Sequence, residues 1–153
     1  WGARLLKGFE SIDSQLIIYM QEDFWPKKDL TLTDDLLKIF HEKKMQCLKI
    51  NNVVQPIQVD VIDGELCKVR QNSPYSLTHQ FGIWNKEFFK KHIYPNENPW
   101  VNEISGSNRI NKEPHNIYQI NHEWYAKVCS RGTLNVYGKR MLESYNLKFE
   151  GKV

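Results

Sequence analysis

Two neighbouring carboxylates, Glu22 and Asp23, come one residue after a short apolar run at residues 16–20. Ligands of open α/β sheets bind outside the ends of buried strands, so carboxylates in this position are expected at the rim of a sheet. Acidic oxygens at such a rim favour a metal ion or a hydroxyl-rich ligand. The competing interpretation is an ordinary loop start, because Asp and Glu are common where a strand ends.

A second pair that can do chemistry is Trp100 and Glu103. Asn98 is a good helix cap and Pro99 is favoured at the first helical position, so Trp100 and Glu103 are expected one turn apart on a short helix. Beside a sugar, the indole would be a wall for the apolar face of the ring and the carboxylate a base for one hydroxyl. The alternative is a buried anchoring Trp100 with an exposed Glu103 beside it.

The elements that position these pairs are predicted from local patterns. Residues 1–12 have helical spacing, residues 16–20 and 47–50 read as strands, and a helix near residues 31–44 connects those strands. Strand, crossover helix and strand in succession are typical of an α/β domain. We expect the strand at residues 16–20 to be central in the sheet, with Glu22 and Asp23 at its C-terminal rim.

Antiparallel structure joins this sheet further along the chain. Alternating residues flank Asp63-Gly64, which is a strong hairpin signal, and Asn85 is placed to cap a helix. The tail reads as strand, turn, strand and a closing helix near residues 137–145. The predicted fold is therefore α/β, a mixed sheet with flanking helices. His122 in this tail is a conceivable third ligand to a metal held by Asp23, although a hydrogen-bonded structural histidine is the simpler interpretation.

Composition bounds the class of protein. The 153 residues are 41% hydrophobic and 25% charged with a formal net charge of +3, which fits one globular domain over residues 1–153 and disfavours nucleic acid as a partner. Three cysteines with no C-x-x-C pair argue against a disulfide framework and a structural zinc site, and they fit a reducing, cytoplasmic setting. The longest apolar run, about five residues, is too short to span a membrane.

Three stretches together resemble the second half of a family of bacterial glycosyltransferases with the GT-A fold. They are DSQLIIYMQEDFWP, YSLTHQFGIWNKEFFKKHIYPNENPWVNEISGS and HNIYQINHEWYAKVCSRGTLN. The shared pattern is a strand ending in an acidic pair, S-L-x-x-Q-x-x-I-W before a helix, S/N-P-W-x-x-E, and a K/R-G turn, here Arg131-Gly132. The resemblance covers about residues 1 to 145.

This resemblance implies a sugar transfer from a nucleotide-sugar donor to a saccharide acceptor. Glu22 and Asp23 would hold a divalent cation, Mn²⁺ or Mg²⁺, on the donor diphosphate. Gln21 stands at the first position of the usual D-x-D motif, which leaves Asp23 as the main ligand. Glu103 would be the general base of an inverting displacement. The resemblance also assigns residues to the sugar pocket: Ser76, His79, Gln80, Trp84 and Trp100.

The resemblance also implies that a nucleotide-binding half lies upstream of Trp1, in agreement with a first helix that has no cap and no initiator Met. The chain alone would then hold an incomplete donor site, and its pathway would be bacterial polysaccharide biosynthesis. Two other classes stay open. A carbohydrate- or partner-binding module, such as a pseudo-enzyme, needs the aromatic residues without the acids, and a plain structural domain needs neither.

Overall fold

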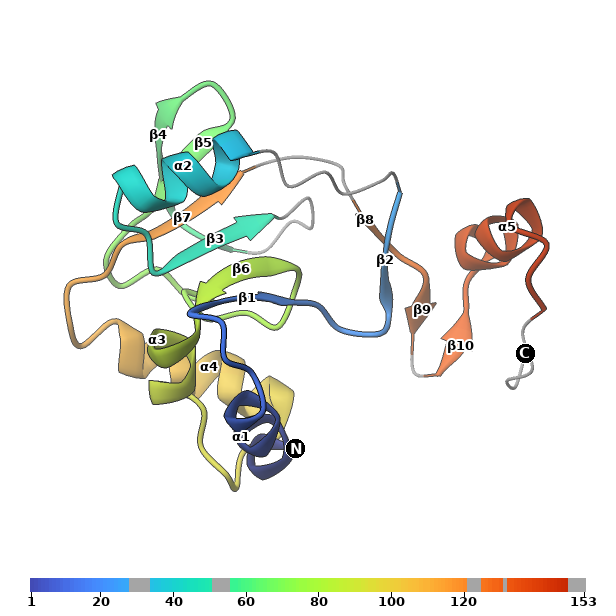
Figure 1. The fold of residues 1–153 in the computed structure, drawn as a ribbon, viewed down its shortest axis with the longest axis horizontal. Helices are drawn as coiled ribbons and strands as arrows, with labels where there is room; N and C mark the ends of the chain where they lie inside the picture. The colour runs from blue at the N-terminus through green and yellow to red at the C-terminus, as the bar shows by residue number, and fades with distance from the viewer. Residues whose placement is uncertain (28–33, 51–55, 121–124, 131, 149–153) are drawn as a thin grey trace.

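The computed structural model describes residues 1–27, 34–50, 56–120, 125–130 and 132–148 (Figure 1). The helices in these residues are α1 (Gly2–Glu10), α2 (Asp34–Glu42), α3 (Lys86–Lys91), α4 (Pro99–Ile110) and α5 (Val136–Ser144). The strands are β1 (Leu16–Tyr19), β2 (Phe24–Pro26), β3 (Cys47–Ile50), β4 (Val59–Asp63), β5 (Leu66–Val69), β6 (Gly82–Asn85), β7 (Ile117–Ile120), β8 (Tyr125–Lys127), β9 (Cys129–Ser130) and β10 (Thr133–Leu134). The α/β class predicted from the sequence is confirmed.

Six strands form one mixed sheet in the order β1-β6-β3-β7-β5-β4. β3 and β7 are parallel, whereas β6 is antiparallel to both β1 and β3. β1 therefore runs in the same direction as β3 and β7, and the C-terminal ends of these three strands lie at the same rim of the sheet. The residues that follow β1, including Glu22 and Asp23, begin at that rim.

The predicted central position of β1 is wrong, because β1 is an edge strand. The strand–helix–strand pattern suggested that β1 and β3 are neighbours, but β6 comes from much later in the chain and lies between them. Ile18 of β1 is exposed, whereas Ile17 is buried. The apolar run of β1 is thus buried on one face, which suits an edge strand.

Two hydrophobic clusters cover the two faces of the sheet. Phe9 of α1 and Ile110 of α4 belong to the cluster on one face, and Phe40 of α2 belongs to the cluster on the other. Cys47 and Leu48, successive residues of β3, belong to opposite clusters because side chains alternate across a strand. Accordingly α1, α3 and α4 lie on one side of the sheet and α2 on the other (Figure 1).

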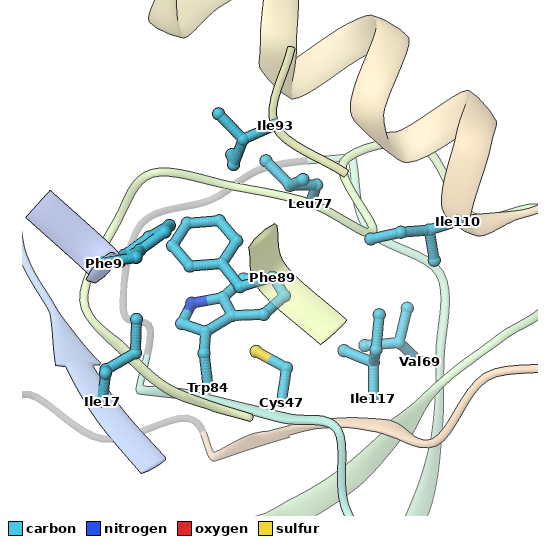
Figure 2. Packing of buried hydrophobic residues seen from close by; sticks show 10 residues of the cluster. All are labelled: Phe9, Ile17, Cys47, Val69, Leu77, Trp84, Phe89, Ile93, Ile110 and Ile117. Carbon is cyan, nitrogen blue, oxygen red and sulfur yellow. The ribbon is translucent and has the colours of Figure 1, made fainter. Parts of the chain in front are cut away.

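Trp84 lies at the centre of the first cluster. Its indole stacks on Phe89 of α3 with ring centroids 4.4 Å apart and an interplanar angle of 13°. Figure 2 shows this stack beside Cys47 and the aliphatic side chains of Val69 and Ile117. Burying so large an aromatic side chain is a major part of the packing energy of this face.

Local hydrogen bonds explain where the helices on this side begin. Asn85 Oδ1 accepts from the backbone N–H of Phe88, and Asn98 Oδ1 accepts from that of Val101, both at 2.9 Å. Both predicted N-caps are confirmed, and Pro99 occupies the first turn of α4. The predicted hairpin at Asp63-Gly64 is also confirmed, since it joins β4 to β5 and Gly64 has a φ of +51°.

The remaining described strands and α5 lie outside the six-stranded sheet. β2 pairs with β8, β9 pairs with β10, and α5 continues from β10, which places them together at one end of the molecule (Figure 1). Asp23 connects this group to the end of β1, because its backbone carbonyl accepts a hydrogen bond from Val128 N at 2.8 Å. No helix in the described residues is both long enough and apolar enough to cross a bilayer.

Candidate functional site

A surface hollow of about 620 Å³ brings together residues from three separate parts of the sequence. We name it the carboxylate hollow. Its lining comprises Gln21, Glu22, Asp23, Pro99, Trp100, Lys127, Cys129, Ser130 and Gly132. Three of the residues singled out in the sequence, Glu22, Asp23 and Trp100, thus lie around one space. Its volume is within the range of small-molecule sites.

The turn after β1 presents the two carboxylates. Phe24 N donates to Gln21 O at 3.2 Å and Trp25 Nε1 donates to Glu22 O at 3.1 Å, which fixes the backbone of this turn. Partial burial raises the pKa of Asp23 above its usual value, although the Lys127 ammonium opposes this shift. Lys127 Nζ lies 4.0 Å from Asp23 Oδ2, so a cationic group already accompanies the carboxylates.

Trp100 borders the carboxylate hollow from the first turn of α4. The Asn98 cap and Pro99 determine where α4 begins and therefore the direction in which this turn faces. The Trp100 side chain is 75% exposed, so the alternative of a buried anchor is wrong. A tryptophan with its ring in solvent beside acidic groups can stack on the apolar face of a sugar ring.

Glu103, the proposed base, is held by the segment before β6. Its Oε1 atom accepts hydrogen bonds from Thr78 Oγ1 at 3.0 Å and from the backbone N–H of His79 at 2.8 Å. Its Oε2 atom accepts no hydrogen bond from any described residue. One carboxylate oxygen is thus held by two donors while the other has no donor among the described residues, an arrangement that a positioned general base could use.

Tyr19 connects the two acidic groups electrostatically. Burial is the main cause that raises the pKa of its phenol, and the negative charges of Glu22 and Glu103 raise it further, against a hydrogen bond from Trp1. Glu22 and Glu103 therefore both act on the hydroxyl at the end of β1. Glu103 itself is not among the residues that line the carboxylate hollow.

The other residues assigned to a sugar pocket lie in the interior. Ser76, His79 and Trp84 have no exposed surface, and Gln80 is 7% exposed. Ser76 Oγ donates to Ser73 O at 2.9 Å, and Gln80 Oε1 accepts from Tyr125 Oη at 3.2 Å. In this structure these side chains lie in the interior, where His79 Nδ1 and Trp84 Nε1 have no hydrogen-bond partner among the described residues, and they do not line the carboxylate hollow.

His79 belongs to a polar network behind Glu103. Asn102 Nδ2 donates to His92 O and to Glu97 Oε2, so its Oδ1 accepts from His79 Nε2 at 2.9 Å. Arg109 donates to both carboxylate oxygens of Glu97, at 2.7 and 2.6 Å. Burial lowers the pKa of His79 to about 4, against the hydrogen bond to Asn102, and the imidazole is neutral at pH 7.

Acid should therefore destabilise the folded protein before its carboxylates titrate. His79 and His92 both have pKa values lowered to about 4 from 6.5, so the unfolded state binds more protons below pH 6.5. The stabilising effect of their neutral forms is complete above pH 6.5 and is lost as the pH falls toward 4. Each histidine contributes up to about 1.4 kcal/mol per pH unit.

This prediction is checked by urea unfolding at several values between pH 6.5 and about pH 5, a range above ordinary carboxylate pKa values. We expect His79→Gln to lower the slope of unfolding free energy against pH, with the remaining slope coming from His92 and His115, whose pKa values burial also lowers. His41→Gln, which changes an exposed histidine of α2, is the matched control and should keep the slope. An unchanged slope in His79→Gln would contradict the buried neutral state.

Sequence reasoning missed the groups that support the proposed site residues. Thr78 holds Glu103, Lys127 accompanies Asp23, and the fully buried Lys49 donates to the carbonyl of Tyr75. Burial lowers the pKa of Lys49 to about 8, with the nearby Cys47 and the charge of Glu103 acting in the opposite direction. Their contacts join residues far apart in the chain, so no local pattern indicates them.

The acidic turn has two carboxylates that could contact a metal ion. No group of three or more His, Cys, Asp or Glu side chains suited to a metal ion is present in the described parts of the chain. Glu22 and Asp23 provide two carboxylates, and Mg²⁺ sites commonly use one or two carboxylates and complete their coordination with water and substrate phosphates. The acidic turn fits that kind of site. His122 and Arg131 lie outside the described residues.

Comparisons with known proteins give no relative. The chain matches no protein-family model, no curated protein and no solved structure. The carboxylate hollow and the contacts of Glu103 are therefore the basis for any statement about function.

Proposed function

We propose that the chain forms the cation-binding and acceptor side of a glycosyltransferase that moves a sugar from a nucleotide-sugar donor to a saccharide acceptor. The observation that carries the proposal is the carboxylate hollow, in which Glu22 and Asp23 lie with Trp100. Glu103 lies about one turn further along α4, in the electrostatic environment that Tyr19 shares with Glu22. A cation, a sugar platform and a base are the groups that this reaction uses.

The acidic turn is suited to the donor diphosphate. A divalent cation on Glu22 and Asp23 would neutralise negative charge on the departing nucleoside diphosphate. Lys127, at 4.0 Å from Asp23, adds a positive charge at the same rim. This pairing of carboxylates with an ammonium allows the protein to bind both the cation and the phosphate oxygens.

Glu103 would accept the proton of the attacking hydroxyl. The acceptor oxygen forms a bond with the anomeric carbon while the bond from that carbon to the diphosphate oxygen breaks. The proton goes to Glu103 Oε2, and the nucleoside diphosphate leaves with the bonding electrons. A single displacement with one base inverts the anomeric configuration, and Thr78 and His79 keep Glu103 in place for it.

A saccharide-binding module without catalysis is the second candidate. The exposed Trp100 favours it, because an aromatic platform beside a polar hollow binds sugars without any need for a base. The candidates differ in what Glu103 does. A binding module keeps all of its function in Glu103→Gln, whereas a transferase loses turnover.

The proposed function is tested with a panel of uridine, guanosine and thymidine diphosphate hexoses in the presence of Mn²⁺. The test applies to the chain and to any longer protein that contains it. We expect release of nucleoside diphosphate that increases on addition of a saccharide acceptor, with a product anomer opposite to that of the donor. Failure of every donor to bind or react with such a longer protein would contradict the proposal.

A further inference from the structure

One face of α4 connects two separate hollows. Trp100 lines the carboxylate hollow, and Ile104 lines a second hollow of about 200 Å³. These residues are four positions apart and therefore lie on the same face of the helix, about 6 Å apart along its axis. A ligand that stacks on Trp100 needs to extend by only one helical turn to reach the second hollow.

The second hollow, which we name the apolar hollow, has a different character. It is lined by Pro74, Tyr75, Ile104, Ser107 and Asn108. Ser107 Oγ is occupied by hydrogen bonds with Leu77 and Glu103, so the pyrrolidine, phenol and isoleucine side chains provide most of the contact surface. No carboxylate or ammonium lines this space among the residues that the structure describes. The lining of the apolar hollow therefore suits a hydrocarbon group of a ligand.

The wall of the apolar hollow opposite α4 is held from within the protein. Tyr75 has a φ of 54°, a left-handed backbone conformation that is unfavourable for a residue with a side chain. The buried Lys49 ammonium donates to the Tyr75 carbonyl, and Asn111 Nδ2 donates to Ser73 O at 2.9 Å. The hollow is therefore a preformed feature and does not depend on a free loop.

Exposed apolar side chains accompany the hollow. Ile104 is 58% exposed and Trp100 is 75% exposed, and Val101 between them is also exposed. Single exposed apolar residues are ordinary on protein surfaces, but a contiguous apolar surface beside a binding hollow is typical of ligand contact. This surface begins at the carboxylate hollow and ends at the apolar hollow, so its two ends differ in polarity.

We infer that the acceptor is an amphiphile, a saccharide joined to an apolar aglycone. The saccharide stacks on Trp100 at the carboxylate hollow, and the aglycone crosses Ile104 into the apolar hollow. This inference rests on the proposed function for the identity of the saccharide end. A lipid chain and an aromatic aglycone share the required chemistry, and the test below separates them.

The test compares methyl, hexyl and phenyl β-glucosides and β-galactosides, all below their micelle concentrations, by NMR titration of the labelled full chain. Each methylene that the hollow buries should improve affinity by about fourfold. We therefore expect hexyl glycosides to bind at least about tenfold more tightly than methyl glycosides. Tighter binding of hexyl than of phenyl glycosides identifies a chain as the aglycone, and the reverse order identifies an aromatic group. Either order supports an apolar aglycone.

Ile104→Asn should remove the dependence on aglycone size and leave the affinity for methyl glycosides unchanged. Val136→Asn is the matched control, because Val136 is an exposed valine of α5 that lines neither hollow, and it should keep the dependence. Equal affinity for methyl and hexyl glycosides in the unchanged protein would overturn the inference. A size dependence that persists in Ile104→Asn would also overturn it.

The result of the aglycone test can be distinguished from the result of the donor test of the proposed function. If donors react but aglycone size has no effect, the inference fails and the glycosyltransferase proposal stands. If aglycone size acts through Ile104 but no donor binds, the amphiphile site stands and the transferase proposal fails.

Discussion

Replacing Glu103 by Gln is expected to lower the turnover of sugar transfer by about 10² to 10⁴, with donor affinity largely unchanged. The amide oxygen of Gln can still accept the hydrogen bonds from Thr78 Oγ1 and His79 N, so the side chain keeps its position. What the variant loses is the ability to take a proton. The measurement is kcat and the donor KM at saturating acceptor, with thermal unfolding to confirm the fold.

Glu87→Gln is the matched control for this experiment. Glu87 is exposed in the first turn of α3, so the same change of charge there should leave turnover within assay error. Glu103→Ala separates the two roles of the side chain, because it also removes the acceptor of the two hydrogen bonds. It should destabilise the protein by about 1–3 kcal/mol, whereas Glu103→Gln should not. Full turnover in Glu103→Gln would show that Glu103 is not the base and that it only holds the segment before β6 by hydrogen bonds.

The features that local sequence predicted are those whose contacts span a few residues. Asn98 and its hydrogen bond to Val101 N determine the start of α4, and this alone allowed Trp100 and Glu103 to be paired on one helix. The hairpin at Asp63-Gly64 likewise depends on two residues and their immediate neighbours. These interactions form within one turn of chain, so their signals are present in short stretches of sequence.

The order of the strands could not be predicted in the same way. β6 lies between β1 and β3 because of pairings such as Ile17 with Trp84 and Cys47 with Trp84, which join distant parts of the chain. A local pattern records that a strand forms and which face is apolar, but not which strand it meets. This is why the position of β1 was wrong although its existence was right.

Buried polar residues are the second feature that limits prediction of the site from sequence. Ser76, His79 and Gln80 carry the donors and acceptors of a sugar site, and the same groups also satisfy an interior. Their residue types cannot separate these uses, and burial decides for the interior here. Trp100 is the opposite case. Its residue type allowed either a buried anchor or an exposed sugar platform, and the structure shows that it is exposed.

The second large effect is expected from Asp23→Ala, which should reduce transfer by at least about a thousandfold and remove Mn²⁺ binding at the carboxylate hollow. The fold should tolerate the change. Burial raises the pKa of Asp23, so its charge is not favoured there, and the distance of 4.0 Å to Lys127 makes a weak ion pair. The Asp23 carbonyl that binds Val128 N is kept.

Binding is measured without any assay of transfer, through the broadening of amide signals that paramagnetic Mn²⁺ causes in its vicinity. In the unchanged protein the broadening should centre on residues 21–24, and in Asp23→Ala it should disappear from them. Asp13→Ala, an exposed carboxylate ahead of β1, is the control that should keep it. Because a ligand carboxylate must be deprotonated and the pKa of Asp23 is raised, Mn²⁺ should also be released on acidification at a higher pH than from an ordinary aspartate.

Lys127 provides the decisive comparison for the role of the cation. If the ammonium alone neutralises the leaving diphosphate, Lys127→Met should abolish transfer, while removal of divalent cations with EDTA should have no effect. If the cation on Asp23 does so, EDTA should abolish transfer and Mn²⁺ should restore it. Lys127→Met should then lower transfer only modestly, because the carboxylate turn and its cation remain. Full transfer at saturating donor in EDTA would therefore remove the metal from the mechanism and leave Asp23 as the partner that positions Lys127.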